Sequence, residues 1–179
     1  NNAPISTNAL TLAGLTGDDT NTVSLKAVGT FAQVSVGTNI AVTLLDSTLT
    51  GSNSSNYNLS FAGAPTNVAD ITAAPLSIGG AFTADSKTYD GDDVAVIAND
   101  KLSLLTPASV DQGDTNKLRL LPRAAFSQSS VGTNLTVNLT TNSALQGTSA
   151  VNYFLTNFAS APTATATISN RPAYITGSF

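Results

Sequence analysis

The chain has 179 residues, a length that fits one large domain or two domains of about 90 residues each. Only 10% of the residues are charged, the formal net charge is −4, and every acidic residue is Asp. The sequence contains no Cys and no His, which excludes the usual zinc and iron–sulfur sites, a thiol nucleophile and a Ser-His-Asp relay.

The same composition favours strands and argues against two kinds of partner. Glu is a good helix former whereas Asp is a turn and cap residue, so the use of Asp alone favours strands and turns. No apolar run approaches the roughly 18 residues of a membrane helix. The basic patch at Lys117, Arg119 and Arg123 is too sparse for nucleic acid in a negatively charged chain. We therefore expect no membrane insertion and no nucleic-acid partner.

In chain order, apolar residues of the first half alternate with polar ones in three runs. A period of two indicates a strand with one face in the core. The residues expected to point inward are Val23 and Leu25 in the first run, Ile40, Val42 and Leu44 in the second, and Tyr57, Leu59 and Phe61 in the third. Turn sequences separate the runs: Gly17-Asp18-Asp19, Val36-Gly37-Thr38-Asn39, Thr50-Gly51-Ser52-Asn53 and Ala62-Gly63-Ala64-Pro65.

Residues 73–80 connect the two halves of the chain. Leu76 and Ile78 have the pattern of a strand, and the polar part of this linker is very short. Two domains joined here are expected to stack end to end with restricted hinge motion.

The second half of the sequence repeats the first. Asp19, Phe31 and 36–39 recur 95 residues later, Tyr57 recurs 96 residues later as Tyr153, and Pro75 recurs 97 residues later as Pro172. The inward positions of the second copy are Leu118 and Leu120, then Leu135, Val137 and Leu139, then Tyr153 and Leu155, with Phe158 one residue late as in a β-bulge.

This register predicts two domains, 1–78 and 79–179, of which the first lacks its opening strand. The missing part corresponds to about fifteen residues, 83–97 of the second copy. Either the sequence begins inside a repeat of a longer array, or the first domain takes this strand from elsewhere. Six to eight short strands per copy suit an immunoglobulin-like sandwich, about 100 residues long. The predicted fold is therefore all-β, with two tandem immunoglobulin-like β-sandwich domains.

Several ordered motifs of the second copy resemble the YDG-type repeats of large bacterial exoproteins similar to filamentous haemagglutinins. They are Lys87-Thr88-Tyr89-Asp90-Gly91, Gly113-Asp114, Ala125-Phe126, Val131-Gly132-Thr133, Asn152-Tyr153 and Ala166-Thr167-Ile168. The resemblance departs at Ser169–Pro172, which replaces a common Thr-Pro-Ala type of ending. It implies an exported, many-repeat adhesin or surface filament, extracellular or on the bacterial cell surface, whose repeats act as stalk or spacer modules.

The densest acidic cluster is a weak candidate for calcium. Asp90, Asp92 and Asp93 alternate along a turn, as calcium ligands do, but calcium takes six to eight oxygens and this run offers only a few. A tight Asp-Gly turn with solvated carboxylates is the favoured interpretation. A turn is likewise favoured over a calcium site at Asp18-Asp19 and at Asp114 of the other copy. No other cofactor is expected.

The tyrosines are expected to be structural. Tyr89 is expected to pack its ring on the core and to bind a backbone carbonyl with its hydroxyl, as a corner tyrosine does. Tyr57 and Tyr153 are expected in or near the core. Only Asp, Lys and Tyr remain as acid–base groups, and no pair of them is found at one fixed spacing in both copies, so no catalytic residue is assigned.

Three functions remain open. The first is a non-catalytic structural spacer whose partners are neighbouring repeats. The second is a filament subunit, polymerised with other copies by strand donation into the incomplete first domain. The third is an adhesin module that binds a host or surface ligand, which the sequence does not identify.

Overall fold

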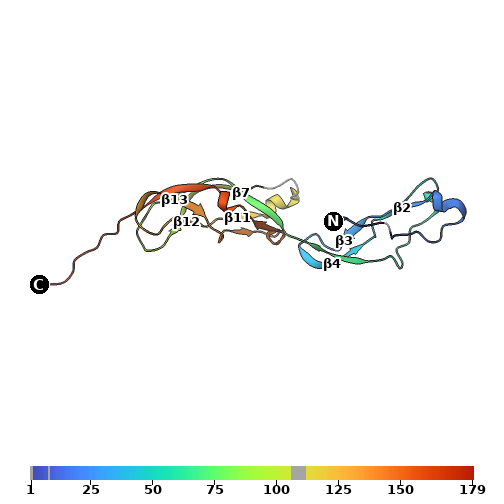
Figure 1. The fold of residues 1–179 in the computed structure, drawn as a ribbon, viewed down its shortest axis with the longest axis horizontal. Coiled ribbons are helices and arrows are strands. Elements are labelled where there is room, and N and C mark those ends of the chain that lie inside the picture. Colours follow the sequence, from blue (N-terminus) through green and yellow to red (C-terminus); the bar gives the residue numbers. More distant parts are fainter. Residues whose placement is uncertain (1, 8, 106–111) are drawn as a thin grey trace. The chain divides into compact units, whose positions relative to one another are not determined.

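The computed structural model describes residues 2–7, 9–105 and 112–179 (Figure 1). The predicted all-β fold is confirmed, because the helical segments in these ranges are short 3-10 turns between strands. They are η1 (Gly17–Asn21), η2 (Ser54–Asn56), η3 (Gln112–Lys117), η4 (Ala150–Asn152) and η5 (Phe158–Ser160). None of these described turns has the length and apolarity needed to cross a membrane.

The chain divides into two compact units, Asn1–Thr72 and Ala73–Phe179. This division differs from the predicted boundary after Ile78. The physical reason is the strand that spans residues 74–84, which pairs along its length with strands of the second unit.

The first unit has a four-stranded antiparallel sheet and a separate two-stranded ribbon. The sheet has the order β1-β3-β4-β6, formed by Asn2–Ala3, Gly29–Phe31, Gly37–Thr43 and Asn67–Ile71. The ribbon pairs β2 (Ser24–Lys26) with β5 (Thr48–Thr50).

The second unit has the same framework and one further sheet. Its largest sheet has the order β8-β16-β13-β12-β9, formed by Lys87–Thr88, Thr163–Ser169, Gly132–Leu139, Ala124–Phe126 and Val94–Ala95. A second sheet has the order β10-β7-β15, formed by Ile97–Leu105, Ala74–Ala84 and Tyr153–Leu155, and β11 (Arg119–Leu121) pairs with β14 (Ala144–Gln146). The core of this unit contains buried residues from both large sheets, Ile78 and Phe82 of β7 among them.

The alternation predicted for the central strand is confirmed in both units. Ile40 and Val42 of β4 are buried, as are Val137 and Leu139 of β13, while the residues between them face outward. The two strands also have equivalent neighbours, since β4 pairs with β3 and β6 and β13 pairs with β12 and β16.

The sequence predicted that the Val-Gly-Thr-Asn segments are turns that separate strands, and this prediction is wrong. Each lies at the start of a strand, where the register shifts between Gly37 and Ile40 and between Gly132 and Leu135. Asn39 and Asn134 take the left-handed backbone conformation, with φ of 52° and 51°. Asn tolerates this conformation better than most residues, so it can place a bulge in a strand without ending the pairing.

The third predicted strand is found in one unit only. Residues 153–155 form β15, which pairs in parallel with β7, whereas residues 57–61 form no strand. Among the described residues of the first unit there is no counterpart of β7 for them to pair with. The bulge predicted at Phe158 is a 3-10 turn instead.

The burial of β7 gives a direct test of the core. Ile78 is 2% exposed and its repeat counterpart Ile175 is fully exposed. We expect Ile78→Ala to lower the free energy of unfolding of the second unit by about 2–5 kcal/mol, through lost burial and a residual cavity. Ile175→Ala, the matched control, is expected to change it by less than about 0.5 kcal/mol. Denaturant unfolding of dilute protein measures both, and equal effects would contradict the assignment of Ile78 to the core.

Candidate functional site

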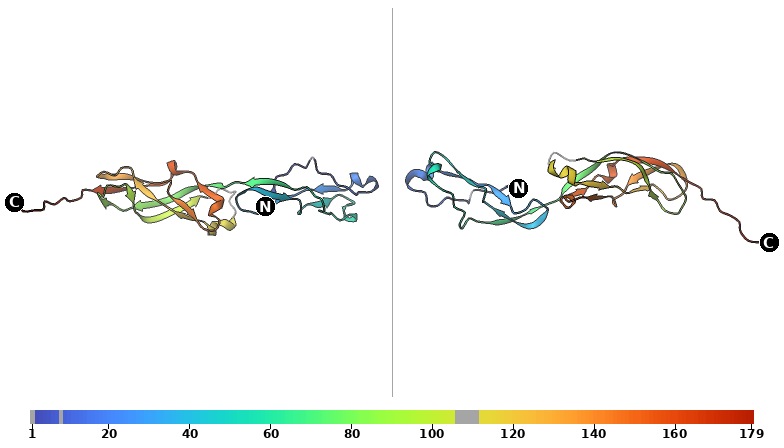
Figure 2. Two further views of the ribbon diagram at one scale, coloured as in Figure 1. Left: turned by 90° about the horizontal axis from the view of Figure 1, so that it is seen from below. Right: turned by 180° about the vertical axis from the view of Figure 1, so that it is seen from behind.

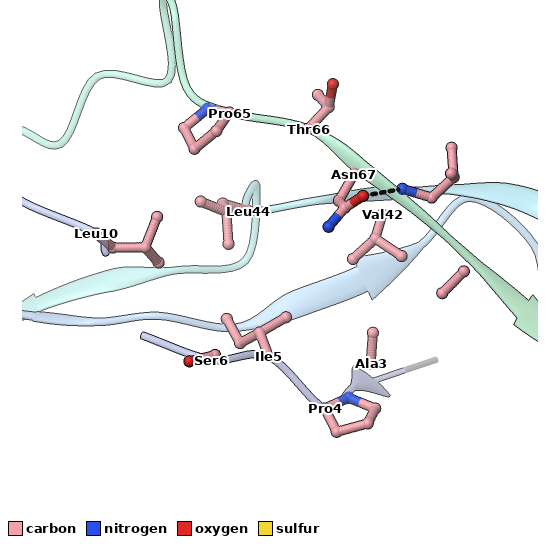
Figure 3. Close-up of a pocket in the computed structure, with 12 residues that line it drawn as sticks. Ala3, Pro4, Ile5, Ser6, Leu10, Val42, Leu44, Pro65, Thr66 and Asn67 are labelled. Carbon is pink, nitrogen blue, oxygen red and sulfur yellow. Dashed lines mark hydrogen bonds between the residues drawn. The ribbon is translucent and has the colours of Figure 1, made fainter. Parts of the chain in front are cut away.

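An apolar groove crosses the first unit. It consists of two hollows of about 350 and 400 Å³ that share Leu10, Leu44 and Pro65 in their walls. The side chains of Ile5, Leu10, Val42 and Leu44 face the first hollow (Figure 3). The second hollow continues along residues 57–65.

One wall of the groove corresponds to strand β10 of the second unit. Strand β1 pairs Ala3 with Gly29, as β9 pairs Ala95 with Ala124, so the two N-terminal segments align at a displacement of 92 residues. In this register Ile5, Leu10 and Leu12 match Ile97, Leu102 and Leu104, and each of the six is half-buried. The described residues among 4–13 nevertheless form no strand, whereas β10 pairs with β7.

The opposite wall of the groove corresponds to strand β15. Tyr57 and Leu59 match Tyr153 and Leu155, which belong to β15. In the second unit β7 lies between β10 and β15 and pairs with both. The groove of the first unit is therefore the position that β7 fills in the second.

Burial in the two units reflects this difference. Phe126 and Leu139 are buried at 3% and 4% exposure, whereas their counterparts Phe31 and Leu44 are only half-buried. The first unit thus has an open apolar face where the second has a closed core.

The acidic turn of the second unit holds a lysine between its carboxylates. The ammonium of Lys87 lies 2.8 Å from Asp90 Oδ1 and 2.5 Å from Asp92 Oδ1, and it donates to the Asp92 carbonyl at 2.9 Å. It also lies 5.8 Å from the centre of the Phe126 ring, within the range of a cation–π contact. The Lys-Thr-Tyr-Asp-Gly motif therefore ties its turn to the apolar core.

The charges of this turn shift one another's pKa values. Desolvation lowers the pKa of Lys87, but hydrogen bonds to Asp90 and Asp92 outweigh it, so the net pKa is raised. The hydrogen bond from Lys87 lowers the pKa of Asp90. Asp93 is exposed, and its carbonyl accepts the Phe126 N–H at 2.7 Å. Calcium binding by Asp90, Asp92 and Asp93 stays a prediction, and in the described residues no group of three acidic side chains has metal-binding geometry.

Tyr89 does not act as the predicted corner tyrosine. Its side chain is 42% exposed, and it is the backbone N–H of Tyr89 that binds a carbonyl, that of Ser169, at 2.9 Å. This bond belongs to the parallel pairing of β8 with β16, in which Thr88 lies opposite Ser169.

A second polar cluster recurs in both units and was missed as a pair in the sequence. The hydroxyl of Tyr57 donates to Asp19 Oδ2 at 2.6 Å, and that of Tyr153 donates to Asp114 Oδ2 at 2.9 Å. The separation along the chain differs by one residue between the copies, which hid the pairing. The available signal was that both residue types recur at equivalent positions.

A third residue completes each Asp–Tyr pair. Asn53 Nδ2 donates to the other oxygen of Asp19 at 2.6 Å, and Ser149 Oγ donates to that of Asp114 at 2.7 Å. The hydrogen bonds from Tyr57 and Asn53 lower the pKa of Asp19, and those from Ser149 and Tyr153 lower the pKa of Asp114. Each carboxylate therefore acts as an ionised anchor between distant segments.

A buried serine forms a further shared contact. Ser47 Oγ accepts the N–H of Val28 at 2.9 Å and donates to its carbonyl at 3.4 Å. Ser143 makes the same two contacts with Arg123, at 2.9 and 3.2 Å. Each serine side chain therefore satisfies the N–H and the carbonyl of one residue, as a neighbouring strand would.

A family model described as the YDG domain matches residues 1–67 and 72–166. The chain belongs to the YDG domain family. No curated protein and no solved structure matches the sequence. The second YDG match begins next to Ala73, where the second compact unit begins, so it includes β7 from its first residue.

The Asp–Tyr anchor gives each YDG unit a predictable response to acid. Because the pKa of Asp114 is below 3.8 in the folded unit and close to that value when unfolded, the unfolded state binds more protons in this range. The stabilisation is present above pH of about 4 and is lost as the pH falls through the folded pKa. We expect that in Asp114→Asn the free energy of unfolding of the second unit falls less steeply as the pH is lowered.

Free energies of unfolding at a series of pH values measure the effect. Asp93→Asn, at an exposed position, is the matched control and should leave the slope unchanged. An unchanged slope in Asp114→Asn would show that the anchor contributes nothing in this range.

Proposed function

We propose that the chain is a structural repeat module, a stalk or spacer, of a bacterial extracellular surface protein or adhesin, and that it is not an enzyme. The observation that carries the proposal is what the two YDG units have in common. The shared features are the Asp–Tyr anchor, the Asn bulge and the buried serine. The anchor and the serine join distant segments of the same unit, and the bulge shapes its central strand, so all three serve the architecture of the unit.

The chemistry of the shared polar groups supports a non-catalytic role. A general acid or base works best with a pKa near the operating pH. Asp19 and Asp114 have lowered pKa values, and both oxygens of each accept hydrogen bonds within the unit. These carboxylates are suited to holding a fold and poorly suited to moving protons.

The composition supports an extracellular location. The chain has no Cys and no Met, the side chains most readily oxidised outside the cell. Its polar surface relies on Ser, Thr and Asn, and only 10% of its residues are charged. The partners that we propose are neighbouring repeats of the same protein.

A spacer makes a specific prediction about length. If strands of about ten residues at 3.3 Å each run along a unit, each unit adds roughly 30 to 40 Å. Small-angle scattering of the chain and of a tandem duplication of it should show the maximum dimension growing by about twice this amount. Growth far below it would contradict the spacer proposal.

A filament subunit is the second candidate function, favoured by the open groove of the first unit. An apolar cleft flanked by two segments whose counterparts are paired strands is the kind of site that accepts a donated strand. The identity of the donor is argued below.

A further inference from the structure

We infer that the groove of the first unit accepts one extended strand, and that its occupant is the C-terminal segment Pro172–Phe179 of a second copy of this chain. The inference adds a partner to the proposed spacer function. Its test is association between chains, which is separate from the length measurement, so either can fail alone.

Strand β7 shows what the groove is shaped to hold. It pairs antiparallel with β10 and in parallel with β15. Leu76, Ile78 and Phe82 on one of its faces are 1%, 2% and 6% exposed. The groove of the first unit lies between the counterparts of β10 and β15, so it offers one empty strand position with an apolar floor.

The C-terminal segment repeats the sequence of β7. Pro172, Ile175, Gly177 and Phe179 match Pro75, Ile78, Gly80 and Phe82 in the same order and spacing. Residues 170–179 form no regular structure and extend away from the sheets of their own unit (Figure 2). Ile175 and Phe179 are fully exposed, although their counterparts are buried. The chain thus carries a β7-like strand with no sheet around it.

The glycine of this segment fits the restriction that the groove would impose. Gly80 of β7 has φ of +86°, and a Cβ there would lie 2.2 Å from the carbonyl oxygen of Lys101. A side chain at this position is therefore excluded in the second unit. Gly177 keeps the glycine, with φ of +122°, although nothing lies within 4 Å of it in its own chain. Docking into a β7 position explains the glycine.

Two residue differences, one in the C-terminal segment and one in the groove wall, compensate each other in size. In the second unit Gly79 pairs with Ser103, and a Cβ on Gly79 would lie 2.8 Å from the side chain of Leu105, two residues further along β10. The C-terminal segment has Thr176 in place of Gly79, and the first unit has Ala13 in place of Leu105. The larger donor residue thus meets the smaller wall residue.

The order of segments along the chain favours a second copy as the donor. Two residues separate the end of β6 in the first unit from the start of β7, and Pro172 lies just beyond Ser169, where β16 ends. Within the chain, β7 follows the first unit and completes the second unit. Docking of residues 172–179 into another copy would repeat this arrangement, because the segment follows the second unit of one copy and would complete the first unit of the next. Such a head-to-tail contact is heterologous, because two different surfaces meet, and it produces a ring or an open chain of copies.

Sedimentation velocity over a range of concentrations tests the contact. The wild-type chain should form oligomers as its concentration rises, and Gly177→Val should remain monomeric because its side chain would meet the backbone of the acceptor wall. Ser178→Ala is the matched control, since its counterpart Ala81 is exposed in β7, and it should associate like the wild type. Circular dichroism should show that all three chains fold alike.

Exchange of the compensating residues tests the register. Ala13→Leu should weaken association by about tenfold, and Thr176→Gly in the same chain should restore it. A general folding defect from Ala13→Leu would not be repaired by a change in the C-terminal segment. Failure of the second change to restore association would overturn the proposed register.

A peptide assay distinguishes the donor from other contacts. The Gly177→Val chain keeps an open groove, so a peptide of residues 170–179 should bind it, and the same peptide with valine at position 177 should bind at least about tenfold more weakly. A monomeric wild type that binds no peptide would overturn the inference. So would equal association of wild type and Gly177→Val, or a monomer whose own C-terminal segment is protected from hydrogen exchange.

Discussion

The pairing of β7 is the constraint on which the rest of the structure depends. This strand supplies Ile78 and Phe82 to the core of the second unit and gives both β10 and β15 a hydrogen-bonding neighbour. Where its counterpart is absent, residues 57–61 and the described part of 4–13 form no strand although their apolar patterns persist. Backbone groups in a sheet need a partner, so one missing strand removes the regular structure of two others.

How far the sequence could predict the fold follows from this dependence. The central strands β4 and β13 were predictable because their period of two reports burial of one face, which is a local property of the sequence. The third run, Tyr57 to Phe61, has the same period and yet is not a strand, because strand formation depends on a partner distant in sequence. The Val-Gly-Thr-Asn motif was misread as a turn, since the same residues that favour turns also allow a bulge within a strand.

The contacts of the candidate site were only partly predictable. Asp19, Asp114, Tyr57 and Tyr153 were each singled out by recurrence, but their pairing required the fold, because some 38 residues separate them. Gly51 and Gly147 show what recurrence can indicate: a Cβ on either would lie about 2 Å from a backbone carbonyl of the preceding segment, so only glycine fits. The groove was anticipated as an incomplete first domain, but its match to the position of β7 became evident only when β7 was seen to lie between two walls that the first unit also has.

The position of β7 also distinguishes the repeat of the sequence from the compact unit of the fold. In the sequence, the β7 pattern follows directly on the last strand of the preceding unit, and residues 172–179 repeat it after the second unit. In the fold, the same strand completes the unit that comes after it. The strand that closes the core of the second unit therefore belongs to that unit, although its sequence pattern is repeated after the unit ends. If residues 172–179 dock into a second copy as we infer, the contact between copies reproduces a strand pairing that already exists within the second unit.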